Sequence, residues 1–249
     1  MLDIRIQIVN YKTKPYLLDC IASMREELES ASFSYSFALL DNASGDDLSD
    51  IPKRFPWLKN LEIIQGTKNL GFGAGHNLLA KGADEKYLLI LNPDIKFIEP
   101  DTIRRLLDEM KRSRSQIVGP RLITAEGKRQ AWDHGGWHGT MCYFKSACGI
   151  NESRSDAKMR RSIWVSGAVF LIERNCFDRV SGFDEQFFLY AEEIDLCDRV
   201  RKNKGVVMYV PDINVLHLGG VVANRNDWLF GSTMRLYKNR FLRLVKIVR

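Results

Sequence analysis

Long apolar runs are missing from this sequence. No uncharged apolar stretch approaches the roughly 20 residues that a membrane-spanning helix needs, so no transmembrane helix is expected. The N-terminus alternates charged and aliphatic side chains and has no signal-peptide core. Cysteines are few, odd in number and scattered, which is typical of reduced thiols: Cys20, Cys142, Cys148, Cys176 and Cys197. We expect a cytoplasmic protein.

An excess of charge is also missing over most of the chain. The 37 basic and 31 acidic residues give a net charge of +6. Residues 231–249 hold as many basic residues as this excess and no acidic one: Arg235, Lys238, Arg240, Arg243, Lys246 and Arg249. A near-neutral body argues against a nucleic-acid partner. The basic segment predicts an amphipathic C-terminal helix, which either packs on the body or docks on an anionic membrane, at the inner face of the cell membrane.

The apolar content, 45% of 249 residues, is enough for a sizeable core. Short apolar segments alternate with helical patterns. We expect strands at 4–9, 37–40, 61–64, 87–91, 117–118, 164–172 and 206–210. We expect helices at 15–28, 71–83, 101–112, 174–180 and 191–204. This alternation predicts an α/β fold with a mostly parallel sheet covered on both faces, interrupted by an irregular polar loop at 124–161.

Polar residues follow three of the expected strands. Asn10-Tyr11, Asp41-Asn42 and Asn92-Pro93-Asp94 stand where the strands end. Ligands of open parallel sheets bind beyond the carboxyl ends of the strands, so Asp41 and Asp94 are candidate site residues. Asp and Asn also form turns without any function, and both interpretations stay open.

A glycine-rich segment runs from Asn69 to Asn77. Glycines let backbone amides approach a phosphate, and the N-terminus of the following helix favours an anion. The spacing is not the dinucleotide fingerprint, and the segment begins too long after Ile64 for the tight turn of that motif. By itself the segment is a weak indication of phosphate binding.

Acidic residues follow aromatic ones at 187–198, where Glu192, Glu193 and Asp195 stand in the first turn of an expected helix. That arrangement complements the helix dipole without any function. Apolar rings and like charges also raise the proton affinity of a carboxylate, which suits a general base.

Histidines give weaker indications. His217, in His-Leu-Gly-Gly, matters only if a metal lies nearby. The spacing of His134, His138, Cys142 and Cys148 fits no standard zinc pattern, so no zinc site is expected.

Taken in order, these motifs resemble the inverting GT-A glycosyltransferases of the rhamnosyltransferase type, in family 2, over nearly the whole chain. The motifs are Val9-Asn10-Tyr11, Asp41 to Asp46, Asn69 to Asn77, Leu91 to Asp94, Ser166 to Arg174, Gly182 to Glu185 and Phe188 to Leu196. The resemblance implies one GT-A-like domain at 1–230, with a mostly parallel mixed sheet flanked by helices. Residues 1–120 would be its nucleotide-binding half and 121–230 its acceptor-binding half, with the C-terminal helix at 231–249.

The resemblance also implies a reaction. A sugar, with rhamnose as the first candidate, would move from a dTDP- or UDP-sugar to a hydroxyl of a surface polysaccharide or lipid-linked glycan precursor. Asp94 and His217 would hold Mn²⁺ or Mg²⁺ at the diphosphate, and Glu193 would deprotonate the acceptor. The donor side would comprise Asn10, Tyr11, Asp41, Asn69, Asn77, Asn92 and Asp94, and the acceptor side Gly167, Ala168 and Glu192.

Three positions depart from the family pattern. Glu193 stands where the family usually has Asp, Asn92 replaces a first aspartate, and Val221 with Val222 replaces a serine after the His-x-Gly-Gly segment. A non-catalytic nucleotide-sugar-binding relative is therefore one alternative. A nicotinamide-dependent oxidoreductase that binds pyrophosphate at Gly71–Gly75 and a ribose at Asp94 is another, although Pro93 and the late glycine segment argue against it.

Overall fold

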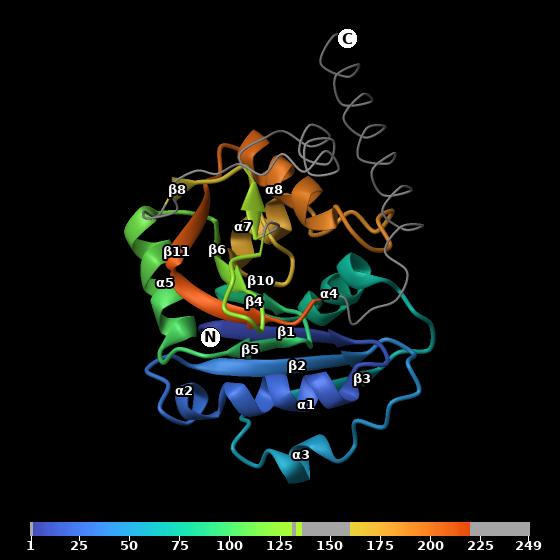
Figure 1. The fold of residues 1–249 in the computed structure, drawn as a ribbon. Coiled ribbons are helices and arrows are strands. Elements are labelled where there is room, and N and C mark those ends of the chain that lie inside the picture. Colours follow the sequence, from blue (N-terminus) through green and yellow to red (C-terminus); the bar gives the residue numbers. More distant parts are fainter. Residues whose placement is uncertain (1, 131–132, 136–159, 220–249) are drawn as a thin grey trace.

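The computed structural model describes residues 2–130, 133–135 and 160–219. Its main sheet has the strand order β3-β2-β1-β4-β10-β6-β11-β5, with β8 beside β11, and β7 pairs with β9 separately (Figure 1). The strands are β1 Ile4–Asn10, β2 Tyr35–Asp41, β3 Leu61–Gln65, β4 Tyr87–Leu91, β5 Ile95–Phe97, β6 Ile117–Ile123, β7 His134–Gly135, β8 Arg160–Arg161, β9 Trp164–Val165, β10 Val169–Glu173 and β11 Val207–His217. The helices are α1 Lys14–Ser23, α2 Arg25–Glu29, α3 Ile51–Arg54, α4 Phe72–Ala80, α5 Thr102–Ser113, α7 Arg174–Arg179 and α8 Glu192–Lys202.

The sheet is mixed, and its first four strands in sequence are parallel. β1 pairs in parallel with β2 and β4, and β2 pairs in parallel with β3. β10 then inserts antiparallel between β4 and β6, and β11 runs parallel to β6. The α/β fold with a mixed, mostly parallel sheet is confirmed. Its topology brings the carboxyl ends of β1 to β4 to one edge.

Side chains of β4 alternate between two cores. Leu89 and Leu91 pack into the core that α1, α2 and α5 cover, whereas Leu88 and Ile90 pack into the core that α7 and α8 cover. Figure 1 shows α1 on one side of β1 and β2 and α8 on the opposite side of the molecule. A strand buried on both faces is apolar at every position, as in the Tyr87–Leu91 segment. Helices therefore cover both faces, as predicted.

The structure corrects several expected boundaries. The helix expected at 15–28 divides at Met24, and the strand expected at 164–172 breaks at 166–168. The last strand does not stop at Val210 but continues to His217, with an irregular register between Val210 and Asn214. Pro211 lies in this irregularity because proline has no N–H to donate to the ladder. The short elements α3, β5, β7 and β8 were not expected from the sequence.

No described helix combines the length and hydropathy that a bilayer crossing requires. The segments 131–132, 136–159 and 220–249 lie outside the described residues. They include most of the loop expected at 124–161 and the whole amphipathic helix expected at 231–249. They also include His138, Cys142, Cys148, Val221 and Val222.

Candidate active site

Asp41 is the centre of a polar row across the ends of β1, β2 and β3. In the parallel register Asn10 stands opposite Asp41, and Asp41 opposite Gln65. The carboxylate of Asp41 is fully buried and accepts hydrogen bonds from Asn10 Nδ2 (3.1 Å), Gln65 Nε2 (2.5 Å), Ser44 N (3.2 Å) and the Ser44 hydroxyl. An ionised carboxylate accepts about four hydrogen bonds, so these four donors fill its capacity. Asp41 therefore holds the side chains of Asn10, Ser44 and Gln65 together at this edge of the sheet.

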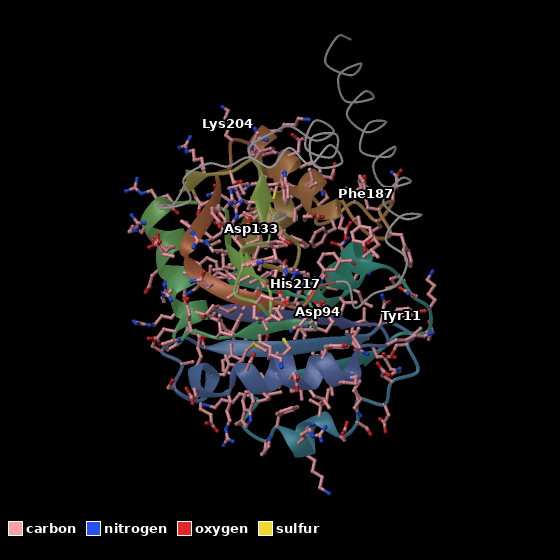
Figure 2. The ribbon with its side chains drawn as sticks, in the orientation of Figure 1. Tyr11, Asp94, Asp133, Phe187, Lys204 and His217 are labelled. Carbon is pink, nitrogen blue, oxygen red and sulfur yellow. The ribbon has the colours of Figure 1, made fainter. Side chains whose placement is uncertain are left out.

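Asn10 connects this row to the loop that follows β2. Its Nδ2 donates to Asp46 Oδ2 at 2.9 Å as well as to Asp41, and its Oδ1 accepts from the Thr13 hydroxyl at 2.8 Å. Asn10 is fully buried, whereas the next residue, Tyr11, is half-buried. Figure 2 shows Tyr11 toward the outer side of this part of the molecule. Of the two, Tyr11 is therefore the one that can meet a ligand directly.

The start of the glycine-rich segment is held by two asparagines. Asn42 donates from Nδ2 to Asn69 Oδ1 at 2.9 Å and accepts at Oδ1 from Leu70 N at 2.8 Å. Asn69 Oδ1 also accepts from Gly71 N at 2.9 Å. Asn42 was not assigned a role from the sequence, where its only signal was its place beside Asp41. Both side chains shape the loop that follows the polar row.

The glycines of this segment pack against protein atoms. A Cβ on Gly71, whose φ is +82°, would overlap the carbonyl oxygen of Phe188. A Cβ on Gly73 would lie 2.9 Å from the Phe183 Cβ, and one on Gly75 2.9 Å from Val9 Cγ2. Close packing alone therefore explains all three glycines. The oxidoreductase alternative, which used this segment for pyrophosphate, loses its main support.

Asn77 joins α4 to the segment at 183–185. Its Nδ2 donates to the Phe183 carbonyl oxygen at 2.9 Å and to Glu185 Oε1 at 3.1 Å, and its Oδ1 accepts from Phe183 N at 2.9 Å. These bonds fix the segment that leads to α8. A role of Asn77 in donor binding remains a prediction.

Asp94 and His217 face each other across the ends of two elements. Asp94 lies in the turn between β4 and β5, and His217 is the last residue of β11, paired with Ile95. His217 Nε2 lies 3.4 Å from Asp94 Oδ1, and the Leu218 N–H donates to the Asp94 carbonyl oxygen at 3.0 Å. Figure 2 shows the two side chains side by side, near the middle of the view. The pair expected at the metal is thus brought together.

Gln130 fixes the orientation of the His217 ring. Its Nε2 donates to the His217 carbonyl oxygen at 2.5 Å, so its Oε1 faces His217 Nδ1 at 2.8 Å and accepts the ring proton. When Nδ1 carries the ring proton, Nε2 presents a lone pair to the Asp94 carboxylate. Two acceptors at this separation stabilise each other only with a proton or a cation between them.

These two side chains fit a hard divalent ion. Ligands about 2.1 Å from one ion stand roughly 3 Å apart, close to the 3.4 Å between Nε2 and Oδ1. Carboxylate oxygen and imidazole nitrogen are both accepted ligands of such ions, and Gln130 acts as the outer partner that orients a ligating histidine. Within the described part of the chain, no group of three or more His, Cys, Asp or Glu side chains could hold a metal. Further ligands would therefore come from substrate oxygens and water.

Glu192 and Glu193 open α8. The two residues before them, Tyr190 and Ala191, have positive φ angles of 70° and 72°, so the chain turns sharply into the helix. Glu192 is buried, and its Oε2 has no hydrogen-bond partner among the described residues, whereas Glu193 is half-buried. Burial raises the pKa of Glu193 to about 7. Burial, followed by repulsion from Glu193, raises the pKa of Glu192 to about 8. The raised proton affinity expected from the sequence is present.

A short turn connects Glu193 to the Asp94 loop. Gly167 lies beside Glu193 and Phe72. A Cβ at position 167 would be 3.5 Å from the Glu193 Cβ and 3.5 Å from Phe72 Cζ. The next residue, Ala168, accepts a hydrogen bond at its carbonyl oxygen from Asn92 N at 2.8 Å. The 167–168 turn thus lies beside Glu193 at the start of α8 and is bonded to Asn92, two residues before Asp94.

Residues 6–186, well over half of the chain, match the family described as Glycosyl transferase family 2. This chain belongs to that family. It is 30% identical over 233 residues to the N-acetylglucosaminyl-diphospho-decaprenol L-rhamnosyltransferase of Mycobacterium tuberculosis (strain ATCC 25618 / H37Rv), covering 84% of this chain and 74% of the relative. It is 26% identical over 233 residues to rhamnosyltransferase WbbL of Escherichia coli (strain K12), covering 80% of this chain and 78% of the relative.

Solved structures share the fold at low sequence identity. GalNAc-T7 with UDP, GalNAc and Mn²⁺ superposes with a TM-score of 0.67 at 15% identity, over 91% of this family 2 chain and 46% of that chain. Staphylococcus aureus TarS 1-349 superposes with a TM-score of 0.63 at 14% identity, over 87% of this chain and 60% of that chain. The present chain thus spans less than two thirds of either structure. The GT-A-like fold expected from the motifs is confirmed.

Three further polar residues of this edge were not assigned contacts from the sequence. Gln65, Gln130 and Asp46 contact Asp41, His217 and Asn10 respectively. The division into halves at residue 120 stays a prediction. His134 belongs to another cluster, where its Nδ1 lies 2.8 Å from Asp133 Oδ1 and its ring stacks on Tyr209.

Proposed function

We propose that this chain is a metal-dependent inverting glycosyltransferase. It moves a sugar, rhamnose in the first instance, from a dTDP- or UDP-sugar to a hydroxyl of a lipid-linked glycan precursor or surface polysaccharide. The observation that carries the proposal is the Asp94–His217 pair, together with the Gly167–Ala168 turn, which lies beside Glu193 and is bonded to the segment just before Asp94. Further support comes from the two relatives named as rhamnosyltransferases, and from a structural neighbour, GalNAc-T7, whose crystal structure contains UDP and Mn²⁺.

The donor lies along the carboxyl ends of β1 to β4. The pyrimidine occupies the row of Asn10, Asp41 and the adjacent Tyr11, and Asn69, Asn77 and Asn92 line the path toward the diphosphate. Asp94 and His217 would hold Mn²⁺ or Mg²⁺. A bound ion would offset the charge that develops on the leaving diphosphate.

Glu193 takes the proton from the acceptor hydroxyl as that oxygen attacks the anomeric carbon, with inversion. A general base works best when its pKa lies near the operating pH, which the value of about 7 satisfies. Gly167 and Ala168 leave room for the acceptor beside the base. Glu192, whose pKa burial also raises, stands beside the base on the acceptor side.

The proposed acceptor also indicates where in the cell the protein acts. A lipid-linked precursor lies in a membrane leaflet, and the basic segment 231–249 would bring this cytoplasmic protein to the inner face. If vesicles with and without anionic lipid bind the full chain equally, that role for the segment fails.

Ion-dependent nucleotide binding tests the core of the proposal. UDP or dTDP should raise the unfolding temperature only with Mn²⁺, and Asp94→Ala should remove this effect. Glu193→Gln should keep donor binding and lose transfer. Full turnover by the Glu193→Gln protein would exclude Glu193 as the base.

The sequence also raised a non-catalytic relative as an alternative, because Glu193 replaces the usual Asp and Val221 with Val222 replaces the usual serine. It requires donor binding with neither transfer nor slow hydrolysis of a dTDP- or UDP-sugar. Measuring both products with the unaltered chain separates the two candidates. Binding of NADH, followed by its fluorescence, would instead revive the oxidoreductase alternative.

A further inference from the structure

Phe72 opens α4 beside the proposed base. A Cβ at position 167 would lie 3.5 Å both from Phe72 Cζ and from the Glu193 Cβ, so the tip of the ring and the Glu193 Cβ are at most twice that distance apart. Phe72, Gly167 and Glu193 are all half-buried, so solvent reaches the place where they meet. Neither the motifs nor the resemblance gave Phe72 a role of its own.

The Phe72 ring is held from behind by other rings. It makes edge-to-face contacts with the His76 ring, at a centroid distance of 4.5 Å, and with the Phe183 ring, at 5.7 Å. His76 is fully buried, and this burial lowers its pKa to about 3, so the imidazole packs as a neutral ring. The Phe72 N–H donates to the Phe188 carbonyl oxygen at 3.0 Å. Ring and backbone are therefore both fixed, and the tip of the ring is the part that faces Gly167.

A base at position 193 can serve two nucleophiles. In transfer, the acceptor oxygen bonds to the anomeric carbon, its proton passes to Glu193, and the bond from that carbon to the diphosphate breaks. In hydrolysis, a water molecule takes the place of the acceptor: its oxygen bonds to the anomeric carbon, one of its protons passes to Glu193, and the same diphosphate leaves. Excluding water from the site is one way to prevent this side reaction.

The edge of an aromatic ring is well suited to keep water away. A water molecule bound in a protein needs about two to four polar partners. The Phe72 ring fills the space beside Gly167 with C–H groups, and Gly167 itself has no side chain. A water on this side of Glu193 therefore finds no polar side chain on Phe72 or Gly167 to hold it for attack.

We propose that Phe72 excludes water from Glu193 and so directs the reaction toward the acceptor hydroxyl rather than toward hydrolysis of the donor. This assignment rests on the proposed function, in which Glu193 is the base. His76 and Phe183 are the positioning residues that hold the ring. Phe72 thus determines which of two nucleophiles the site uses.

Hydrolysis of dTDP-rhamnose by the full chain, in saturating Mn²⁺ and without acceptor, tests this assignment. Phe72→Ala admits water beside the base and should raise the rate about tenfold, a part of the roughly 10²–10⁴ that a positioned general base supplies. A merely structural defect would lower the rate instead. Phe72→Leu, which keeps a large apolar side chain, should give a smaller rise. Tyr16→Ala, which removes an exposed aromatic ring on α1, is the matched control and should leave the rate unchanged.

A second change shows whether the gain passes through the base. Glu193→Gln added to Phe72→Ala should abolish the extra hydrolysis, while calorimetry should find unchanged dTDP binding in Phe72→Ala. Phe72→Val carries the test if the alanine variant does not fold. A Phe72→Ala protein that binds dTDP normally and hydrolyses dTDP-rhamnose no faster than the unaltered chain would overturn this assignment and leave the proposed function standing. If neither dTDP nor UDP binds the unaltered chain with Mn²⁺, both fail.

Discussion

The pH dependence of transfer follows from the environment of Glu193. Burial raises the pKa of this carboxyl from 4.5 to about 7. A base must be ionised to accept a proton, so kcat/KM should rise as the pH passes upward through about 7 and reach a plateau above it. The ascending limb belongs to the free enzyme, because kcat/KM reports its ionisations.

The raised pKa makes the effect large. At pH 5, about two units below the pKa, only about 1% of Glu193 would be ionised, so kcat/KM should be roughly a hundredfold below its plateau. A glutamate with the ordinary pKa of 4.5 would be mostly ionised at pH 5 and would lose less than about twofold. Transfer rates at low donor concentration, from pH 5 to 9 in saturating Mn²⁺, separate the two cases.

Glu192→Gln is the matched control for this measurement. Burial raises the pKa of Glu192 as well, and glutamine copies the shape of its neutral acid, so this variant leaves Glu193 as the titrating member of the pair. The limb near pH 7 should therefore persist in this variant. Donor binding measured at each pH shows whether the limb comes from binding instead. A flat profile between pH 5.5 and 8, or loss of the limb in Glu192→Gln, would refute the assignment of the base.

Two further predictions concern the support of the site. Gly71→Ala should lower the unfolding temperature by several degrees, because its Cβ would overlap the Phe188 carbonyl oxygen and its φ is +82°; an unchanged value in a thermal melt would contradict this packing. Gln130→Leu should weaken Mn²⁺ binding by about tenfold without unfolding the chain, because His217 loses the partner that orients its ring; equal ion affinity by calorimetry would remove Gln130 from that role.

The sequence predicts where β1, β2 and β4 end, to within one residue, but not the contacts between those ends. Apolar runs that stop at Asn10 and Asp41 show where β1 and β2 end, and a parallel sheet brings such ends together. Gln65 was missed because an exposed glutamine after an apolar run carries no signal. Only its register with Asp41 shows its position.

Other features depend on residues far away in the chain. The glycines at 71 and 73 look like a phosphate loop, yet they pack against Phe188 and Phe183, more than 100 positions later. His217 could be placed beside Asp94 only by resemblance, because the strand that carries it continues past Pro211, where the apolar pattern ends. The pattern of neighbouring residues carries no information about such long-range packing.

The glutamate at position 193 gives a physical meaning to the departure from the usual aspartate. Backbone N–H groups at the start of α8 lower the pKa of Glu193, while burial raises it more strongly. An aspartate is one methylene shorter, so its carboxylate would lie closer to those N–H groups and ionise more easily. Glu193→Asp should therefore move the ascending limb of kcat/KM to a pH below about 7. If the ascending limb moves to a higher pH instead, burial rather than the helix N-terminus dominates the pKa of the shorter side chain.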